Sequence, residues 1–404
     1  MLAIWIGPNL YVSVHNTKDI ETILKTKEVE KGDEYKYLKP WLGEGLLTSS
    51  GDKFKINKKL IMPSFHVNNL KRFMDVFNDH SLTLVENLRE KVGNGEFDID
   101  PYLSTFTMDV LLETVIGISK DTLTDQAVTY KKAIHHRLSR CSGKKILIYT
   151  IMCGVNHNFK DKVMEELNEV FGKSSSPITY NDLQKLQYLE QVIQETWRLY
   201  PPIPILVKKA SCNVPLGKKI LIYTIMCGIN HNFKDKVMEE LNEVFGKSSS
   251  PITYNDLQKL QYLEQVIQET WRLYPPIPIL VKKASCNVPL DTCTLPKGCS
   301  IGLYLFGLHR DPTQYKDPHK FNPDNFLPET IKTRNPFSFL PFSAGSRTCI
   351  GAKYATMLIK VVLATLLRSY RVTSSWNESE FVISAQTVLR RTEGFPINLH
   401  FHEN

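Results

Sequence analysis

Apolar residues recur at helical spacing along much of the chain, and this spacing predicts a mainly α-helical protein. The helices expected in the N-terminal half are Thr17–Leu24, Leu70–Val92, Met108–Ile116 and Tyr130–Arg137. Near the C-terminus, one apolar helix face combines Ile350, Tyr354, Leu358, Val361, Val362 and Leu366. Alternating apolar and polar residues predict a small β region, with a strand over Trp5–Val14 and two strands, Phe381–Leu389 and Phe395–Phe401, around Glu393-Gly394.

The middle of the chain holds one long repeat. Residues 143–216 recur as residues 217–290, and the two copies differ only at Val155 and Ile229. Solenoid repeats keep a pattern while their sequences diverge, and a stacking array needs roughly three or more units. The near identity therefore indicates an exon duplication or an assembly error rather than a tandem functional domain. We expect three segments, 1–142, 143–216 and 217–404, of which the second is redundant.

Each copy of the repeat predicts two helices separated by a Ser-Ser-Ser-Pro loop. In the second copy, the later helix covers Leu257–Tyr274 and is stopped by Pro275-Pro276. Glu269 and Arg272 lie three residues apart, so they share a helix face and can form an ion pair. Their copies are Glu195 and Arg198. Taken alone, such a pair indicates no more than an exposed salt bridge.

Composition sets broad limits on the function. With 42% hydrophobic and 23% charged residues among 404, the chain is typical of a globular protein with a large core or two domains. Its eight cysteines include no C-x-x-C pair and resemble neither a disulfide framework nor a zinc site, which favours reduced thiols on a cytosolic face. The formal charge of +8, taken alone, indicates a solvated surface. No motif indicates nucleic-acid binding.

The apolar run Met1–Ile6 ends at Gly7-Pro8 and is too short for a transmembrane helix or a signal peptide.

The stretch Pro341–Gly351 carries the strongest chemical signal. Cys349 precedes the predicted C-terminal helix, where the positive end of the helix dipole favours a thiolate. Gly345 and Gly351 permit tight turns and the close approach of a flat ligand. Arg347 offers a fixed positive charge to a carboxylate. Taken alone, Cys349 would be interpreted as a buried structural cysteine.

The spacing of this stretch changes that interpretation. Phe342, Gly345, Arg347, Cys349 and Gly351 form the string F-x-x-G-x-R-x-C-x-G, which resembles the haem-binding loop of the cytochrome P-450 family. The resemblance implies haem b as cofactor, with the Cys349 thiolate as the fifth ligand of its iron, an arrangement that favours O–O cleavage. It also implies that Arg347 holds a haem propionate. The fold expected from the resemblance is the family's helical fold, shortened and carrying a duplicated segment.

Two further segments resemble the same family. Trp41–Ser49 is similar to the W-L-G-x-G-L-L-x-S segment of its fatty-acid-hydroxylase branch, family four. Gly51–Phe65, which follows, resembles the family's next helix, in which a W-x-x-x-R string supplies a tryptophan and an arginine to one propionate. Here those positions hold Phe54 and Lys58, so Lys58 is either a propionate contact or a solvated lysine. His66 is expected to be a helix cap or a surface histidine rather than a ligand.

The resemblance also gives the E-x-x-R pair a structural role. In the family this pair is buried and locks the core around the haem-binding loop, without taking part in catalysis. We assign the role to Glu269 and Arg272, because only the second copy continues into Asp291–Gly298, which resembles the strand and turn that follow in the family. The family's F-x-P-x-R-F segment adds an arginine to the pair. That position is Asn325 here, so the third charge is missing.

The function implied by the resemblance is that of a monooxygenase, which inserts one oxygen atom from O₂ into an apolar substrate. Family four suggests a fatty acid or a related lipid, with electrons from a flavoprotein reductase that uses NADPH. The resemblance also implies that a basic face of this chain, whose formal charge is +8, receives an acidic electron-donor protein. The tip of the predicted C-terminal hairpin at Glu393-Gly394 would face the substrate. The resemblance places the protein at a membrane surface, on the cytosolic face of the endoplasmic reticulum, although family members usually begin with a membrane anchor that this chain lacks as written. Beyond the haem ligand, no catalytic residue is identified.

One family feature is missing from the sequence. The string [AG]-G-x-[DE]-T-[TS], whose acid and alcohol relay protons to bound dioxygen in the family's central helix, does not occur in the chain. Two alternatives therefore stand beside the monooxygenase hypothesis. The chain is a haem-binding protein without turnover, or it is a defective product that cannot fold or hold haem.

Overall fold

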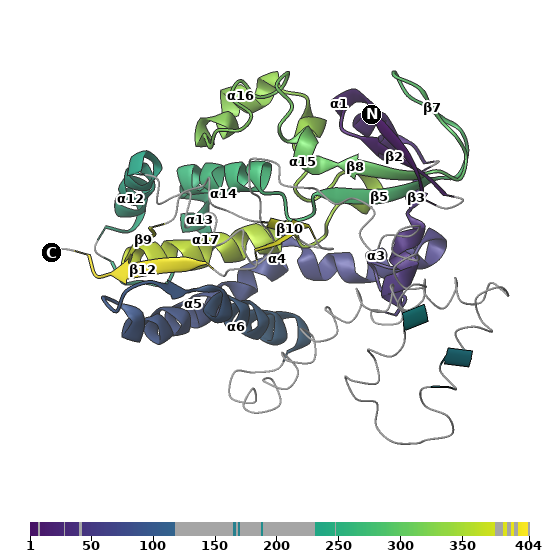
Figure 1. Ribbon diagram of the computed structural model, residues 1–404. Coiled ribbons are helices and arrows are strands. Elements are labelled where there is room, and N and C mark those ends of the chain that lie inside the picture. Colours follow the sequence, from purple (N-terminus) through teal and green to yellow (C-terminus); the bar gives the residue numbers. More distant parts are fainter. Residues whose placement is uncertain are drawn as a thin grey trace. The chain divides into compact units, whose positions relative to one another are not determined.

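The computed structural model describes residues 1–6, 9–27, 29–39, 43–117, 231–246, 248–375 and 395–402, with short stretches at 165–166, 169, 187–188, 383–385 and 389–391 (Figure 1). Met1–Ala3, Tyr11–Leu123 and Lys209–Asn404 form one compact unit, and Ile4–Leu10 with Thr124–Lys208 form a second. The predicted helix Tyr130–Arg137 and most of the first repeat copy lie outside the described residues. The division of the chain into three segments therefore stays a prediction.

The largest sheet among the described residues has five strands, in the order β1-β2-β8-β5-β3. The strands are β1 (Leu2–Ile6), β2 (Asn9–Val14), β3 (Val29–Lys31), β5 (Ile279–Ala284) and β8 (Ser300–Tyr304). β2 runs parallel to β8, while β5 runs antiparallel to β8 and to β3. The single strand predicted over Trp5–Val14 is wrong, because two strands share that stretch. Pro8, which has no amide hydrogen for a ladder, lies between them in the sequence.

Helices make up most of the larger unit, as predicted. Their bounds are α1 (Thr17–Lys25), α3 (Gly51–Ile61), α4 (Val67–Leu70), α5 (Met74–Leu88), α6 (Asp100–Leu111), α12 (His231–Phe245), α13 (Tyr254–Lys259), α14 (Gln261–Leu273), α15 (Leu305–Leu308), α16 (Pro328–Thr333) and α17 (Ala352–Ser369). Asn16 caps α1 by accepting hydrogen bonds from the backbone amides of Lys18 and Asp19. His66 caps α4 with its ring nitrogen, which confirms its prediction as a local cap.

Several predicted helices have different bounds in the structure. The helix predicted over Leu257–Tyr274 is divided at Leu260, whose ψ of 70° is not helical. A capping box between Thr253 and Asp256 starts the first part. The prediction missed the break because no glycine or proline marks it. Leu260 is fully buried at the break, so tertiary packing and not local sequence fixes the turn.

The C-terminal strands also differ from the prediction. β12 (Pro396–His400) pairs with β9 (Arg371–Thr373) and β4 (Phe97–Asp98), and β10 (Ile383–Ala385) pairs with β11 (Leu389–Arg391). The predicted hairpin between 381–389 and 395–401 is therefore wrong, because both strands have other partners. Its predicted tip at Glu393-Gly394 lies outside the described residues.

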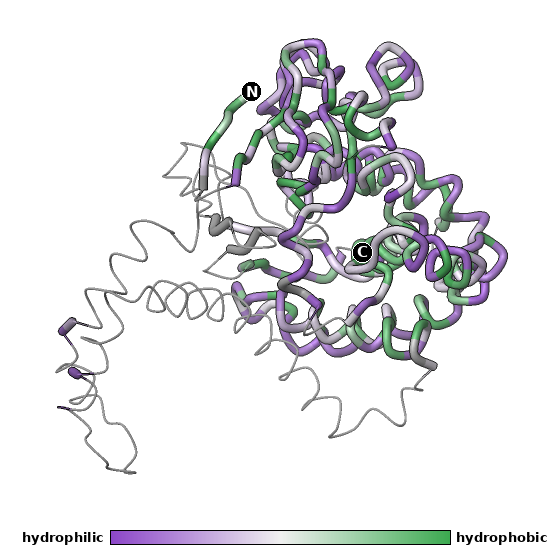
Figure 2. The backbone as a smooth tube through the Cα atoms, turned by 90° about the vertical axis from the view of Figure 1, so that its right-hand side faces the viewer, coloured by the Kyte–Doolittle hydropathy of each residue, from purple (hydrophilic) through white to green (hydrophobic). Residues whose placement is uncertain are grey.

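The core forms around α17. Its buried face includes Tyr354, Leu358, Val361, Val362 and Leu366, which confirms the predicted face apart from the partly exposed Ile350. α17 packs against α5, α12 and α13. The buried Lys360 on α17 donates to the carbonyl oxygen of Leu257 and pairs with Glu264. Figure 2 colours the backbone by hydropathy and shows hydrophilic and hydrophobic residues interspersed along the chain. No helix among the described residues is long and apolar enough to cross a membrane.

Candidate functional site

The Cys349 loop lies directly before α17. The Cys349 amide donates to the carbonyl oxygen of Phe342 (3.0 Å), and the Thr348 amide donates to that of Gly345 (3.2 Å). The Thr348 hydroxyl lies 3.2 Å from the carbonyl oxygen of Ser343, to which it donates. These bonds fix the backbone, while the thiol of Cys349 is exposed and belongs to no disulfide. The alternative of a buried structural cysteine is therefore wrong.

Two glycines shape this loop in different ways. Gly345 has a φ of +74°, and a Cβ atom there would lie 2.7 Å from the carbonyl oxygen of Leu24. Both the backbone conformation and the close neighbour require glycine. Gly351 has room for a side chain, since its nearest neighbours to such a Cβ are the Cys349 sulfur and Phe65, both at 3.9 Å. Gly351 therefore places no side chain beside the sulfur.

Gly345→Ala should lower the free energy of unfolding by about 1–3 kcal/mol, because an L-residue is strained at this φ and meets Leu24. Gly351→Ala is the matched control and should change stability much less. Urea unfolding of the two variants beside the unaltered protein measures the difference. Equal losses would contradict the assignment of strain to Gly345.

Helix α3 is attached to the Cys349 loop by charged side chains. Arg347 donates to the carbonyl oxygen of Ser49 (3.0 Å), and its guanidinium carbon lies 3.4 Å from the ring centroid of Phe54. Lys58 donates to the carbonyl oxygen of Ser346 (2.7 Å) and lies 5.8 Å from the same ring. The Phe54 ring thus contacts both cations. The structure brings these residues together, and their contact with a propionate stays a prediction.

Sequence reasoning missed two cations near Arg347. Lys31 on β3 and Lys282 on β5 are direct partners in the antiparallel ladder. Burial, followed by the charges of Arg347 and Lys282, lowers the pKa of Lys31 to about 8. Burial also lowers the pKa of Arg347. No sequence signal marks these lysines, because their proximity to the loop depends on strand pairing between residues 251 positions apart (282 − 31).

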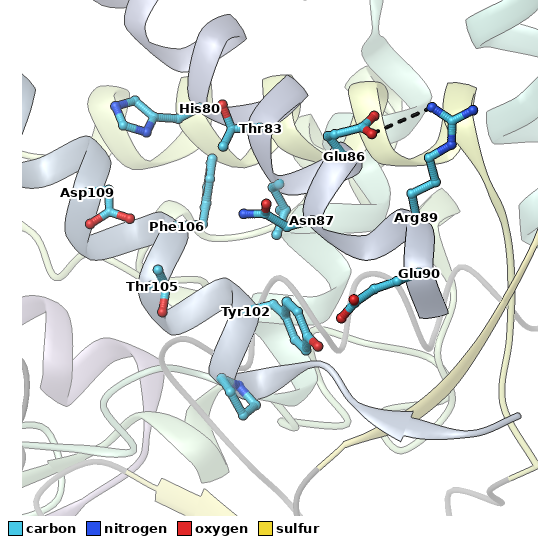
Figure 3. A pocket seen from close by; sticks show the side chains of 12 residues that line it. His80, Thr83, Glu86, Asn87, Arg89, Glu90, Tyr102, Thr105, Phe106 and Asp109 are labelled. Carbon is cyan, nitrogen blue, oxygen red and sulfur yellow. Dashed lines mark ion pairs between the residues drawn. The ribbon is translucent and has the colours of Figure 1, made fainter. Parts of the chain in front are cut away.

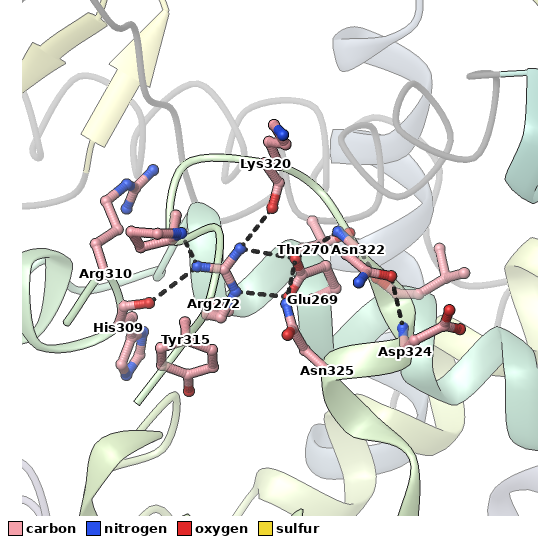
Figure 4. A network of polar contacts seen from close by, with 12 residues as sticks. Glu269, Thr270, Arg272, His309, Arg310, Tyr315, Lys320, Asn322, Asp324 and Asn325 are labelled. Atoms are coloured by element: carbon pink, nitrogen blue, oxygen red, sulfur yellow. Dashed lines mark hydrogen bonds and ion pairs between the residues drawn. The ribbon is translucent and has the colours of Figure 1, made fainter. Parts of the chain in front are cut away.

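Glu269 and Arg272 form a buried pair on α14 (Figure 4). Both side chains are fully buried, and two hydrogen bonds join them, at 2.6 Å and 2.7 Å. Arg272 also donates to the carbonyl oxygens of His309, Pro318 and Lys320. The alternative of an exposed salt bridge is wrong, since this pair links α14 to three positions on the segment that leads to the Cys349 loop.

Asn325 takes part in this network without a charge. Its side-chain amide donates to Glu269 at 3.2 Å, and the backbone amide of Asn322 donates to the same oxygen at 2.6 Å. Arg334 donates to the carbonyl oxygen of Asn325 at 2.5 Å. Its guanidinium lies 4.6 Å from the ring centroid of Tyr315, and that of Arg272 lies 4.8 Å from it. A second cation therefore reaches this network from a position nine residues beyond Asn325, which the motif comparison did not reveal.

Two contacts connect α14 to the loop. The ring nitrogen Nε2 of His309 accepts a hydrogen bond from the Leu340 amide (2.9 Å), while the His309 carbonyl accepts from Arg272. The Trp271 ring packs edge-on against Phe342, with centroids 4.8 Å apart. Phe342 in turn accepts the hydrogen bond from the Cys349 amide. The helix that carries the buried pair therefore also positions the cysteine.

The buried His309 should make the protein sensitive to acid. Burial, assisted by the charges of Arg272 and Arg310, lowers the pKa of His309 from 6.5 to about 3. Between these values the unfolded state binds one more proton at this residue, so stability is present above pH 6.5 and is lost as the pH falls towards 3. In His309→Gln, the free energy of unfolding should change less steeply with pH between these values, by the contribution of about one bound proton. Urea unfolding across this range measures it, with His319→Gln, at an exposed histidine, as the control.

A groove of about 800 Å³ lies between α5 and α6 (Figure 3). His80 and Asn87 from α5 and Thr105 and Asp109 from α6 are among the side chains that line it. The His80 ring contacts Glu113 at 2.6 Å. None of the residues predicted for the haem site lines this groove.

The two repeat copies share one contact among the described residues. Glu240 accepts a hydrogen bond from the Tyr262 amide at 2.6 Å, and Glu166 accepts one from the Tyr188 amide at the same distance. The positions correspond through the repeat offset of 74 (262 − 188). Glu195 and Arg198 lie outside the described residues, so only Glu269 and Arg272 are seen as a pair.

Comparison with known proteins gives one family. The sequence model of the family described as Cytochrome P450 matches residues 1–154, 145–232 and 219–398. Cytochrome P450 4g15 of Drosophila melanogaster is 30% identical, covering 98% of this chain and 84% of that protein. Cytochrome P450 4V2 of Homo sapiens is also 30% identical, covering 99% of this chain and 82% of that protein.

The solved structures agree on the fold. The crystal structure of the cytochrome P450DA heme domain aligns with a TM-score of 0.74 at 15% identity, covering 99% of this chain and 88% of that one. The alignment with the Drosophila protein runs over 487 positions, more than the 404 residues of this chain. That relative therefore carries residues without a counterpart here.

Proposed function

Because the chain belongs to the cytochrome P450 family, with haem iron as its cofactor, we propose that this haem monooxygenase acts on a fatty acid or a related lipid. We further propose that its electrons come from an NADPH-dependent flavoprotein reductase at the cytosolic face of the endoplasmic reticulum. Similarity to relatives named as members of family four supports the substrate class. The observation that carries the proposal is the exposed Cys349 thiol on a backbone fixed by hydrogen bonds.

The residues of the loop fit a haem group. An exposed thiol without a disulfide is the donor that a thiolate-bound iron requires. Gly351 places no side chain beside the sulfur, where a Cβ atom would lie 3.9 Å from it, and this suits the approach of a flat ring. Arg347 is a fixed cation on the same loop. Cys349 would bind the iron, and Arg347, with Lys58 beside it, would hold the propionates.

When bound, a haem with a thiolate ligand supplies the activation of dioxygen that lets one oxygen atom enter an apolar substrate. The chain's own contribution is to hold the sulfur in place. The amide bond from Cys349 to Phe342 and the packing of Phe342 on Trp271 restrict its movement. Arg272 fixes the segment between His309 and Lys320, which keeps the loop against α14.

The second candidate is a haem-binding protein with little or no turnover. The absence of [AG]-G-x-[DE]-T-[TS] from the sequence favours it, because proton delivery in the family uses that acid and alcohol. The family's function and this candidate share the Cys349 site and differ only in turnover. A spectral test and a turnover test together distinguish them.

The spectral test is reconstitution of the full chain with haem, followed by reduction and exposure to CO. A Soret band shifted strongly to the red supports a thiolate ligand. Incubation with a medium-chain fatty acid, NADPH and a flavoprotein reductase then tests turnover, and a hydroxylated product supports the proposed function. The red-shifted band without product favours the second candidate. Failure to bind haem contradicts both.

A further inference from the structure

The loop between α12 and α13 carries a serine that is followed by proline. Of the 22 prolines in the chain, only Pro177 and Pro251 follow a serine or a threonine, and they occupy the same position in the two repeat copies. Pro251 lies among the described residues, where it and residues 248–250 are exposed. The side chain of Ser250 is therefore open to an enzyme that acts on its hydroxyl.

The segment 248–251 is exposed and irregular, and one end of it is anchored. Proline disfavours a helical conformation of the residue before it, and Ser250 belongs to neither a helix nor a strand. Its amide donates to the Ser248 hydroxyl at 3.1 Å, and that hydroxyl donates to the Ser250 hydroxyl at 2.8 Å. The next residue, Ile252, is buried, and the Asn78 side chain bonds its amide and its carbonyl oxygen, both at 2.9 Å.

A cation contacts this segment from the last turn of α17. Arg368 donates to the carbonyl oxygen of Ser248, and its guanidinium carbon lies 4.3 Å from the ring centroid of Phe245. Burial lowers the pKa of Arg368. The charge of Asp256 opposes this effect, but each oxygen of that carboxylate already accepts a hydrogen bond from its own helix or cap.

These contacts bring Arg368 close to the serine that precedes proline. The guanidinium holds the backbone of Ser248, and the hydroxyl of the same residue contacts that of Ser250. A phosphate on Ser250 would therefore lie within reach of the long arginine side chain. It would also be a stronger acceptor than the neutral carbonyl oxygen, because hydrogen bonds between ionised groups are about twice as strong as neutral ones.

We propose that Ser250 is phosphorylated by a proline-directed protein kinase and that Arg368 binds the phosphate. The Ser250 hydroxyl oxygen forms a bond to the γ-phosphorus of ATP, the bond from that phosphorus to ADP breaks, and the hydroxyl proton passes to the carboxylate base of the kinase. The phosphate carries a charge of about −1.5 to −2 and attaches the loop to α17, the helix that follows Cys349. The proposal is independent of haem binding and turnover.

The first test uses the full chain with Ser176→Ala, because the two copies are identical around this position and the change leaves Ser250 as the single serine before a proline. A mitogen-activated protein kinase with MgATP should add one phosphate, measured by intact mass, and none after Ser250→Ala. Ser249→Ala, at the neighbouring exposed serine, is the matched control and should keep the phosphate. A folded chain that takes up no phosphate, while a peptide of residues 245–256 does, would overturn the site.

The second test examines the role of Arg368 by phosphorus NMR of the phosphorylated protein as the pH is varied. Phosphoserine releases its second proton near pH 6, and a neighbouring guanidinium should lower this pKa by about 1. Arg368→Gln should return the pKa to about 6, and Arg368→Lys, which keeps the charge, should hold it below that value. An ordinary pKa in the protein that retains Arg368, or a lowered one that persists in Arg368→Gln, would overturn the assignment of the phosphate to this arginine.

Discussion

Cys349→Ser will remove the strongly red-shifted Soret band from the reduced CO complex. Turnover of any substrate should fall by more than about 100-fold, because even the outer-shell partners of metal ligands are worth roughly 10–100-fold. Serine keeps the size and the backbone bond to Phe342 but offers an oxygen that stays protonated and binds iron weakly. The CO difference spectrum and product formation measure the two effects.

The control for this variant is Cys293→Ser, which removes another exposed free thiol of the same chain. It should leave the spectrum and the haem affinity unchanged. A red-shifted band that persists in Cys349→Ser and disappears in Cys293→Ser would contradict the assignment, because it would make Cys293 the iron ligand. Loss in both would indicate that the thiols act through folding and not through iron.

Arg272→Ala should lower the free energy of unfolding by about 3–5 kcal/mol, because it leaves a buried carboxylate without its partner. Burial raises the pKa of Glu269, and the hydrogen bonds from Arg272 oppose this effect. Without Arg272, Glu269 should take up a proton, and the carbonyl oxygens of His309, Pro318 and Lys320 lose their donor. Haem retention should fall together with stability, since these carbonyls belong to the segment that leads to Cys349. Chemical unfolding and haem release measure the two losses.

The repeat supplies a matched control for Arg272. Arg198 has the same neighbours in sequence, and Arg198→Ala should leave stability and haem retention unchanged if only the second copy fills the core. Arg272→Lys should recover only part of the loss, because lysine keeps the charge but lacks the planar fork that reaches Glu269 and three carbonyls. Equal losses in Arg198→Ala and Arg272→Ala would contradict the assignment of the core position to the second copy.

Helices that depend on nearby residues, such as a cap or an apolar spacing, can be predicted from the sequence. α1 begins after the cap at Asn16, and α17 buries the apolar face that its spacing predicts. The predictions are wrong where contacts with residues distant in sequence decide the end of a helix or the partner of a strand. Leu260 breaks a helix without glycine or proline, and β12 pairs with β4, which lies about 300 residues earlier, instead of with its neighbour in sequence.

The sequence by itself identified the family and predicted Cys349 as the ligand of haem iron, because both depend on residue type and spacing within one short stretch. That Gly345 requires glycine, whereas Gly351 does not, came from the structure. The sequence also identified the pair Glu269 and Arg272. Only the tertiary structure decided that this pair is buried and that Arg334 reaches the network beside Asn325. It also pairs Lys31 with Lys282 across two strands, where the charge of Arg347 lowers the pKa of both. The reason is physical: burial and the approach of charges from separate strands and loops arise when the chain folds, and no local pattern encodes them.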